Sequence, residues 1–467
     1  MPRLINPLYF RKIISRLSFL NALTPMSESS RVSPPQSSKL PTRVRYRVVG
    51  VAILLAMVTY LDRVCIGKLA PEISRDLHLD KIQMGYVFSA FQLSYALFEI
   101  PTAWWADRRG TRLVLTRIVV WWSFFTMLTA ATFNYASMLV TRFLFGVGEA
   151  GAWPCVARTF SRWIPARERG TAKGIFFSGA YLAGGITPPL VEFLLRNDFH
   201  WRWIFVCFGM TGFIWAAVWY WWFRDEPEQH PAVNAAELDL IAIGRPDQAA
   251  HETNWAFWRQ LLCRRNMILI CLMYIPNSVT FYFCITWFPT YLEERHHFKA
   301  AMLGFLSGLP LILSVLSQFL GGFFSDWINS RYGLRIGRRL PGVIGYLIAA
   351  FAILFAVGSN SPQISAVLIA VATASCMFTT ASAWGTCVDI GQQHSAVVGA
   401  TMNSAGAFGS MIGPLVVAYS VQKFNNWDVP LYLLSGMFIF GAICWLFIDP
   451  LKPIFDPERP NSGSHGV

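Results

Sequence analysis

The amino-acid sequence predicts an all-α integral membrane protein with twelve transmembrane helices in two pseudo-symmetric bundles of six. Of its 467 residues, 54% are hydrophobic and only 14% are charged, whereas about 25% of the residues in soluble domains are charged. Apolar stretches of about 20 residues recur along the chain, and each can cross a hydrocarbon layer of roughly 30 Å as a helix. This composition excludes a soluble enzyme, and we expect neither enzymatic activity nor a cofactor.

The N-terminal half begins with a leader, residues 1–42, in which four basic residues precede the first acidic one. We expect this leader to be disordered and cytoplasmic; a transit peptide, or a true start at Met26, are the alternatives. A first six-helix bundle is expected over residues 43–223. Its spans are predicted at Val48–Gly67, Ile82–Trp104, Leu113–Phe133, Ser137–Phe160, Thr171–Leu195 and Trp203–Phe223.

The middle of the chain, residues 224–265, is polar and acidic and contains Pro227 and Pro231, so it is expected to be a cytoplasmic linker with a short helix near Ala235–Ile243. The second six-helix bundle is expected over residues 266–448, and residues 449–467 form a cytoplasmic tail. The spans of this half are predicted at Asn266–Tyr291, Ala300–Phe324, Leu340–Gly358, Gln363–Asp389, Ser395–Gln422 and Val429–Ile448.

The net charge of +13 comes largely from arginines in the short loops before span one and after spans two, four and eight. These loops lie on one side of the membrane, and such an excess of basic residues is typical of cytoplasmic loops. We therefore predict that both termini are cytoplasmic. The expected location is a bacterial inner membrane, and the expected oligomeric state is a monomer. Nucleic acid is not an expected partner. The nine cysteines show no metal-type spacing, so we expect no metal site.

Span four contains two full charges, Arg142 and Glu149, among small residues such as Gly146 and Gly148. Charges inside a membrane helix usually face the bundle interior or a wet cavity. Their separation of seven residues corresponds to about 700° of helical rotation, so both lie on nearly the same face. A buried ion pair beside a packing groove is the structural alternative to a functional site.

Arg63 in span one is expected at a depth similar to that of Arg142, because the two spans cross the membrane in opposite directions. Two guanidinium groups suit a carboxylate, which they bind through paired hydrogen bonds while remaining charged. The hypothesis is that Arg63 and Arg142 hold a small organic anion while Glu149, with Asp62 as its partner, carries a proton. For Asp62, a structural cap or an ion pair with Arg63 is the alternative.

Polar aromatic and amide groups complete the expected site. Tyr60 and Tyr95 can donate hydrogen bonds to substrate hydroxyls, although simple packing is the alternative for each. In the second half, Tyr282 and Asn403 are the preferred candidates.

The two halves also resemble each other. Span two runs into Ala103-Trp-Trp-Ala-Asp107-Arg108-Arg-Gly110-Thr-Arg112, and span eight runs into Gly322-Phe-Phe-Ser-Asp326. Each half thus places an aspartate four residues after a small residue. Internal duplication of this kind is typical of transporters that work by alternating access.

The first of these segments resembles the Gly-x-x-x-Asp-Arg-x-Gly-x-Arg/Lys pattern of the major facilitator superfamily, with Ala103 replacing the first glycine. The resemblance implies the major facilitator fold. It also implies a cytoplasmic gate formed by Asp107, Arg108, Gly110 and Arg112, with Asp326 in the second half. A local loop cap is the alternative interpretation of these residues.

Within that superfamily the chain is similar to the anion:cation symporter family, which includes sugar-acid and phthalate-type permeases and sialin. The similarity rests on Tyr60-Leu-Asp62-Arg63, on Tyr95 ahead of Ile100-Pro101, on Arg142 to Glu149 with Pro154, and on Gly399-Ala-Thr-Met-Asn403. It implies proton-coupled uptake of an organic anion, foremost a sugar acid such as a hexuronate, aldonate or aldarate.

Departures from the family pattern leave the substrate open. Ala180 and Ala407 stand where amide side chains are common, which favours aromatic or dicarboxylic acids as alternative substrates, and Glu99 stands where Gln is frequent. An exporter of the same superfamily is a further alternative. A membrane sensor is disfavoured because the linker is short and contains no signalling motif.

Overall fold

The computed structural model describes residues 40–165, 167–242, 255–298 and 300–455, and these residues form helices and no strands. Ten of the described helical segments are long and apolar enough to cross a membrane. The twelve spans are completed by α3 (Lys81–Arg109) and by α5 (Tyr135–Glu149) together with α6 (Ala152–Trp163). The predicted all-α membrane fold is therefore confirmed.

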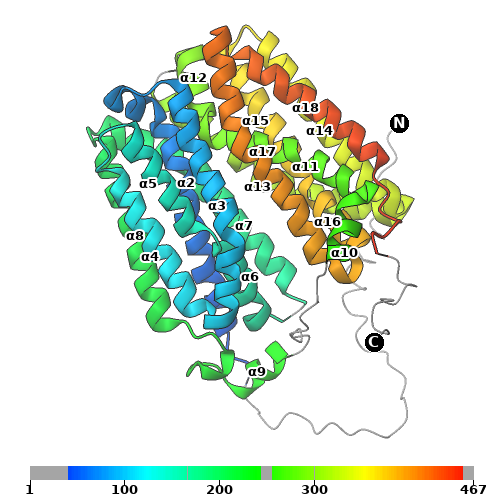
Figure 1. Ribbon diagram of the computed structural model, residues 1–467. Helices are drawn as coiled ribbons and strands as arrows, with labels where there is room; N and C mark the ends of the chain where they lie inside the picture. Colours follow the sequence, from blue (N-terminus) through cyan, green and yellow to red (C-terminus); the bar gives the residue numbers. More distant parts are fainter. Residues whose placement is uncertain (1–39, 166, 243–254, 299, 456–467) are drawn as a thin grey trace, which may run out of the picture.

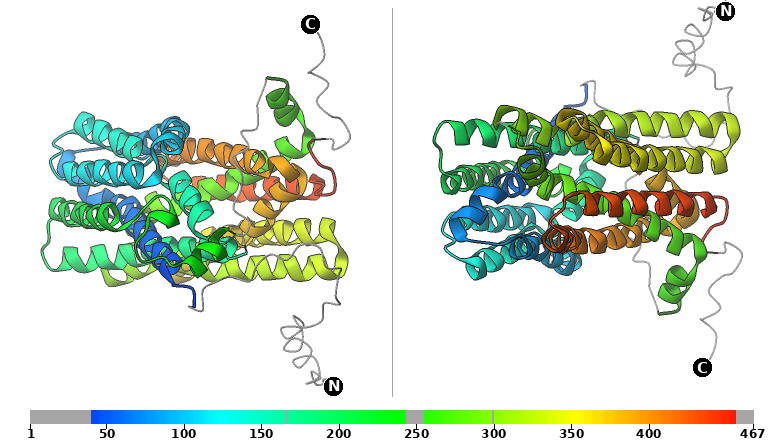
Figure 2. Two further views of the ribbon diagram at one scale, coloured as in Figure 1. Left: turned by 90° about the horizontal axis from the view of Figure 1, so that it is seen from below. Right: turned by 90° about the horizontal axis from the view of Figure 1, so that it is seen from above.

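The helices form two bundles that occupy opposite sides of the molecule (Figures 1 and 2). The N-terminal bundle consists of α2 (Val44–Leu77), α3, α4 (Thr111–Thr129), α5, α6, α7 (Arg169–Arg196) and α8 (Trp201–Trp222). The C-terminal bundle consists of α11 (Arg265–Thr286), α12 (Phe288–His296), α13 (Ala300–Tyr332), α14 (Leu334–Gly358), α15 (Pro362–Phe378), α16 (Thr380–Gly391), η2 (Gln392–His394), α17 (Ser395–Phe424) and α18 (Asp428–Phe447).

Between the bundles, the described part of the linker contains η1 (Pro227–Gln229), α9 (Ala235–Ala242) and α10 (Trp255–Cys263). The helix predicted near Ala235–Ile243 is thus present as α9. In Figure 1, α12 lies at one end of the molecule and α9 at the other, and these are called the α12 end and the α9 end below. The α9 helix is held by Glu237, which is buried and pairs with Arg45 of α2 at 3.1 Å.

A shared turn geometry relates the two halves. Gly110 between α3 and α4 has a φ of 85°, and Gly333 between α13 and α14 has a φ of 82°. An aspartate follows the last span of each half: Asp225 accepts a hydrogen bond from the backbone of Arg112 at 2.9 Å, and Asp449 pairs with Arg335 at 2.8 Å. Only glycine adopts such positive φ values without strain, so the turn is fixed by sequence in both halves.

Span four is interrupted, whereas the sequence predicted one helix over Ser137–Phe160. The α5 helix ends at Glu149, and Gly151 adopts a φ of 89° before α6 begins. A side chain at Gly151 would overlap Thr102 of α3. The break leaves Glu149 at the C-terminal end of a half-helix. Span ten is divided at the corresponding place, between α15 and α16.

Toward the α12 end, small residues allow the backbones of the two bundles to approach each other closely. A methyl group at Gly67 of α2 would overlap the carbonyl of Ile285 in α11, and one at Gly308 of α13 would overlap the carbonyl of Gly185 in α7. Tyr86 of α3 and Tyr419 of α17 share a hydrogen bond of 3.0 Å.

Candidate functional site

The site centres on an ion pair between Arg63 of α2 and Glu149 of α5. The Nε of Arg63 donates to Oε1 of Glu149, and the side chains are only 6% and 1% exposed. The break after Glu149 brings the end of α5 beside the middle of α2. A buried charge without its partner is strongly destabilising. Each of these side chains therefore needs the other as its counter-ion, unless a third charged group enters the site.

Four aromatic rings surround the Arg63 guanidinium. Its central carbon lies 5.0 Å from the ring centre of Tyr95, 5.3 Å from Phe91, 5.6 Å from Trp153 and 5.9 Å from Tyr60. These distances are within the range of cation–π attraction. The rings come from α2, α3 and α6, so three helices of one bundle fix the position of this cation.

The second bundle reaches the same cation through Tyr282 of α11. Nη1 of Arg63 donates to the Tyr282 hydroxyl at 3.4 Å. Beside it, the ring of Phe281 lies 6.1 Å from Tyr60 and 5.7 Å from Tyr181 of α7. Arg63 therefore lies at the junction of the two bundles, where a ligand can contact both.

Arg142 packs against two aromatic rings of the first bundle. Its guanidinium lies 4.1 Å from the ring centre of Phe145 and 5.7 Å from that of Phe91. The Phe91 ring thus lies within 6 Å of both arginines. Nη1 of Arg142 makes no hydrogen bond to any described residue. The ionisable side chains near Arg142 include Glu149, Asp62 and Arg63.

Asp62 is 1% exposed and faces α4, where Thr126 and Trp122 lie beside its carboxylate. Neighbouring residues on a helix point about 100° apart, so Asp62 and Arg63 face different helices. The structure therefore brings Glu149 to Arg63, and Asp62 to the side of Arg142.

The two predicted tyrosines of the first bundle are both buried beside Arg63. Tyr60 packs edge-to-face against Tyr181 with ring centres 5.6 Å apart. The Tyr95 hydroxyl makes no hydrogen bond within the described part of the chain. Glu99 lies one turn beyond Tyr95 on α3.

Asn403 lies apart from this cluster. It is exposed on α17, eleven residues before Pro414. Eleven residues are close to three helical turns, so both residues lie on one face, and a methyl group at Gly85 of α3 would meet the Pro414 carbonyl oxygen at 3.3 Å. Asn403 thus lies on the face of α17 toward the first bundle, roughly 16 Å nearer the α9 end.

The residues of the predicted gate lie at the α9 end. Arg108 stacks on Trp104 at 3.9 Å, and Arg112 donates to the Tyr220 carbonyl of α8 at 2.8 Å. A side chain at Gly110 would overlap the Asp225 carboxylate. These contacts join residues of the N-terminal bundle to one another and to the start of the linker at Asp225. Asp107 belongs to α3, but its side chain lies outside the described part of the structure.

Asp326 is 79% exposed and lies 4.0 Å from Arg338, which bonds more closely to Asp389 at 2.8 Å. It lies seven residues before Gly333, whereas Asp107 lies three before Gly110. Measured from the shared glycine turn, Asp326 is one helical turn deeper than Asp107, so the two aspartates do not occupy equivalent positions.

Sequence reasoning did not select several of the aromatic residues at the site. Phe91, Trp153, Tyr181 and Phe281 all contact the cluster around Arg63. With 71 aromatic residues in the chain, an aromatic side chain by itself indicates little. One signal could have indicated Tyr181: it directly follows Ala180, a position where this sequence departs from the family pattern.

The arrangement of two helix bundles meeting at a buried charged site defines a membrane transporter, not an enzyme. A family model, Major Facilitator Superfamily, matches residues 52–407, and the chain belongs to this family. Relatives include a probable sulfoacetate transporter of Cupriavidus necator, 32% identical over 89% of this chain and 96% of the relative. A probable galactarate/D-glucarate transporter of Escherichia coli K12 is 30% identical over 88% of this chain and 96% of the relative. The resemblance drawn from the sequence is therefore confirmed.

Solved structures support the same fold. A bacterial homologue of the human lysosomal transporter Spinster, crystallised in an inward-facing and unoccupied conformation, covers 87% of this chain and 97% of its own with a TM-score of 0.70. Its sequence identity of 17% supports the fold alone.

Proposed function

We propose that this protein is a proton-coupled symporter that takes up an organic anion, foremost a sugar acid such as a hexuronate, aldonate or aldarate. The observation that carries the proposal is the buried pair of Arg63 and Glu149 at the junction of the two bundles. It joins an anion-binding group directly to a group that can carry a proton.

Anion binding is assigned to Arg63 first. A carboxylate that reaches Arg63 competes with Glu149 for the guanidinium, whose Nη2 makes no hydrogen bond to a described residue. The hydroxyls of Tyr95 and Tyr282 lie beside this position and suit the hydroxyl groups of a sugar acid. Arg142 is assigned a supporting positive charge beside Phe91. Asn403 is assigned to the substrate path on the second bundle.

Proton coupling follows from the exchange of partners. Once the substrate carboxylate neutralises Arg63, Glu149 is left buried without a counter-ion, and burial then favours its protonated form. Release of the anion restores the pair and expels the proton. Asp62 is assigned to the same relay through Arg142. One monoanion with one proton makes the cycle electroneutral, so an inward proton gradient drives uptake.

The relatives support the substrate class. The proteins similar to this chain include transporters named for galactarate and D-glucarate, D-galactonate, and hexuronate. Each of these names denotes a sugar acid, whose carboxylate suits Arg63 and whose hydroxyls suit tyrosine.

Topology is part of the proposal. We assign the α9 end to the cytoplasm of a bacterial inner membrane because Arg108, Arg112, Arg335 and Arg339 gather there. Both termini are then cytoplasmic. The bundles are assigned to residues 43–223 and 266–448, the linker to residues 224–265, and a monomer is the transporting unit. The residues from Asp107 to Arg112, with Asp326, are assigned to closure of the α9 end.

Aromatic acids are the second candidate substrate class. The rings of Tyr60, Tyr181 and Phe281 lie within 6.1 Å of one another beside Arg63, and they can stack on an aromatic acid.

The test is the internal pH of proteoliposomes after external addition of hexuronates, aldonates, aldarates or aromatic acids, each in a sodium-free buffer. Acidification by one or more sugar acids is the expected result. Acidification by aromatic acids alone would show that aromatic acids, and not sugar acids, are the substrates. Uptake of labelled acid without any pH change would exclude proton coupling, and absence of uptake in folded protein would favour export.

A further inference from the structure

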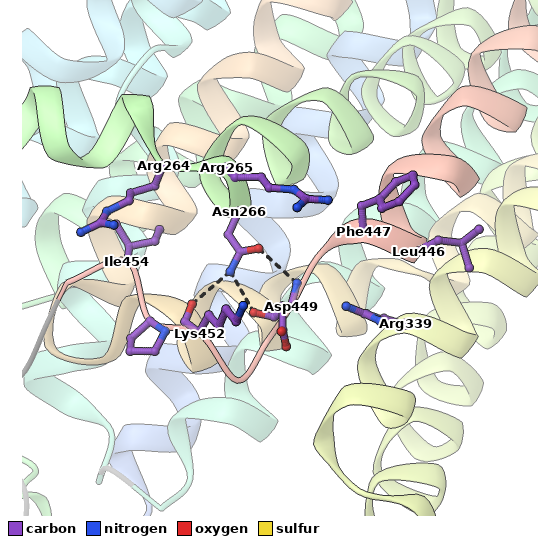
Figure 3. A pocket seen from close by; sticks show the side chains of 10 residues that line it. Arg264, Arg265, Asn266, Arg339, Leu446, Phe447, Asp449, Lys452 and Ile454 are labelled. Carbon is purple, nitrogen blue, oxygen red and sulfur yellow. Dashed lines mark hydrogen bonds between the residues drawn. The ribbon is translucent and has the colours of Figure 1, made fainter.

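A cavity of about 450 Å³ lies in the C-terminal bundle, where α11 and α14 begin and α18 ends (Figure 3). This is the end of the bundle opposite α12, because α12 follows the far end of α11. The wall contains four cationic side chains: Arg264, Arg265, Arg339 and Lys452. The cavity is separate from the Arg63 cluster and has no part in the proposed transport cycle.

The single carboxylate in the wall, Asp449, is already neutralised by a residue outside it. Arg335 bonds both oxygens of Asp449, at 2.8 and 3.2 Å. Burial alone would raise the pKa of Asp449, but the hydrogen bonds from Arg335 hold that pKa below its ordinary value. Among the described residues, no carboxylate forms an ion pair with any of the four lining cations. The cavity therefore carries an uncompensated positive charge.

The cavity wall is held in place by Asn266 at the start of α11. Its side-chain amide donates to the carbonyls of Asp449 at 2.8 Å and of Lys452 at 3.0 Å, and its oxygen accepts from the Asp449 backbone at 3.1 Å. Further along, the backbone of Ile454 bonds to that of Ile390 at 2.8 Å. The segment after α18 is thus fastened across the cavity, and Figure 3 shows these side chains along it.

An apolar surface adjoins the charged cavity. Leu446 and Phe447 line it and are 54% and 52% exposed, and the Arg265 guanidinium lies 5.6 Å from the Phe447 ring centre. Phe440, Ile443 and Phe447 follow one another at spacings of three and four residues, which places them on one face of α18. All three are exposed, so an apolar stripe runs from the cavity along a membrane-spanning helix.

We propose that this cavity binds the phosphodiester headgroup of an anionic phospholipid, whose acyl chains lie along the exposed stripe of α18. Guanidinium groups bind phosphate oxygens through paired, charge-assisted hydrogen bonds, and basic pockets at the ends of membrane helices suit such headgroups. Free phosphate shares the headgroup chemistry but makes no use of the apolar stripe. The continuity of the stripe with the cavity favours the lipid.

The test is competitive lipid binding to the purified, delipidated full-length protein, measured by native mass spectrometry with phosphatidylglycerol and phosphatidylcholine of identical acyl chains. The wild-type protein is expected to retain phosphatidylglycerol preferentially. Combining Arg264→Gln, Arg265→Gln and Lys452→Gln is expected to reduce that preference by about tenfold or more, because each cation near the headgroup contributes to binding.

The matched control removes three exposed cations elsewhere: Arg47→Gln, Arg167→Gln and Arg331→Gln. It lowers the net charge equally and is expected to retain the wild-type preference. Equal losses in both variants, or no preference in the wild-type protein, would overturn the proposal. The competition is repeated with inorganic phosphate at millimolar concentration and with phosphatidylglycerols of different acyl-chain lengths. Displacement by phosphate, together with equal retention of all chain lengths, would assign the cavity to free phosphate and contradict the proposed lipid site. Because the wild-type competition needs no variant, a folding defect in the triple variant leaves the proposal testable.

Discussion

Arg75 of α2 and Glu293 of α12 join the two bundles through an ion pair of 3.1 Å at the α12 end. Lys81 of α3 forms a second such pair with Glu294 of α12 at 3.0 Å, and Trp427 donates to the same carboxylate. Together they connect the N-terminal bundle to α12, which follows α11 in the chain. For alternating access, contacts at this end must break when the opposite end closes.

The combined change Glu293→Gln and Glu294→Gln is expected to shift the protein toward opening at the α12 end. These pairs are partly exposed, so each contributes about 0.2 to 1 kcal/mol, and a population shift of roughly two- to thirtyfold follows. Spin-label distances between α2 and α12 measure it. The control Asp428→Asn removes the pair with Arg295 inside one bundle and should leave the distances unchanged; an equal shift in that variant would contradict the assignment.

Glu149→Gln is expected to abolish gradient-driven accumulation while preserving substrate exchange, because glutamine retains a hydrogen bond to Arg63 but carries no proton. Uphill uptake and counterflow in proteoliposomes measure the two properties separately. Glu192→Gln is the matched control, since Glu192 is a buried carboxylate paired with Lys68 at 2.9 Å. Uphill uptake at the wild-type level in Glu149→Gln would remove this residue from the proton pathway.

Arg63→Ala is expected to weaken substrate binding by about 10- to 100-fold, the loss of one charge-assisted hydrogen bond. Arg142→Ala is expected to cost less, because Arg63 is the cation that contacts Tyr282 of the second bundle, whereas Arg142 lies against Phe145 and Phe91 of the first. Arg63→Lys keeps the buried positive charge but loses the planar guanidinium group. Comparing it with Arg63→Ala distinguishes a loss of binding geometry from a folding defect caused by the missing charge. Binding is measured by isothermal titration calorimetry on protein that is monodisperse. Intact affinity in both alanine variants would place the anion elsewhere.

Gly308→Ala is expected to loosen the α12 end, because a methyl group there would overlap the carbonyl of Gly185 in the other bundle. Gly322→Ala on the same helix is the control, since its methyl group would meet only Ala381 at 3.8 Å. Labelling of cysteines introduced along α7 should rise in the first variant alone. Unchanged labelling would contradict the prediction, because it would mean that α7 and α13 accommodate the methyl group without opening the α12 end.

The sequence by itself determined the membrane class, the number of spans and the two-bundle architecture. These follow from local properties of the sequence: apolar stretches long enough to span the membrane, basic residues in the short loops, and the charged residues Arg142 and Glu149 within an apolar span. The same reasoning selected Arg63, Glu149, Tyr60, Tyr95 and Tyr282, which the fold gathers into one cluster.

Only the tertiary structure decided which of these charges face one another. The sequence treated Arg63 and Arg142 as a pair and Glu149 with Asp62 as another, because helical spacing gives depth and face within one helix only. The break at Gly151 ends α5 at Glu149, whose carboxylate reaches Arg63 of α2, while Arg142 lies against Phe145. Partners across helices depend on how the helices rotate and cross, and that is set by packing of the whole bundle rather than by the sequence of any one span.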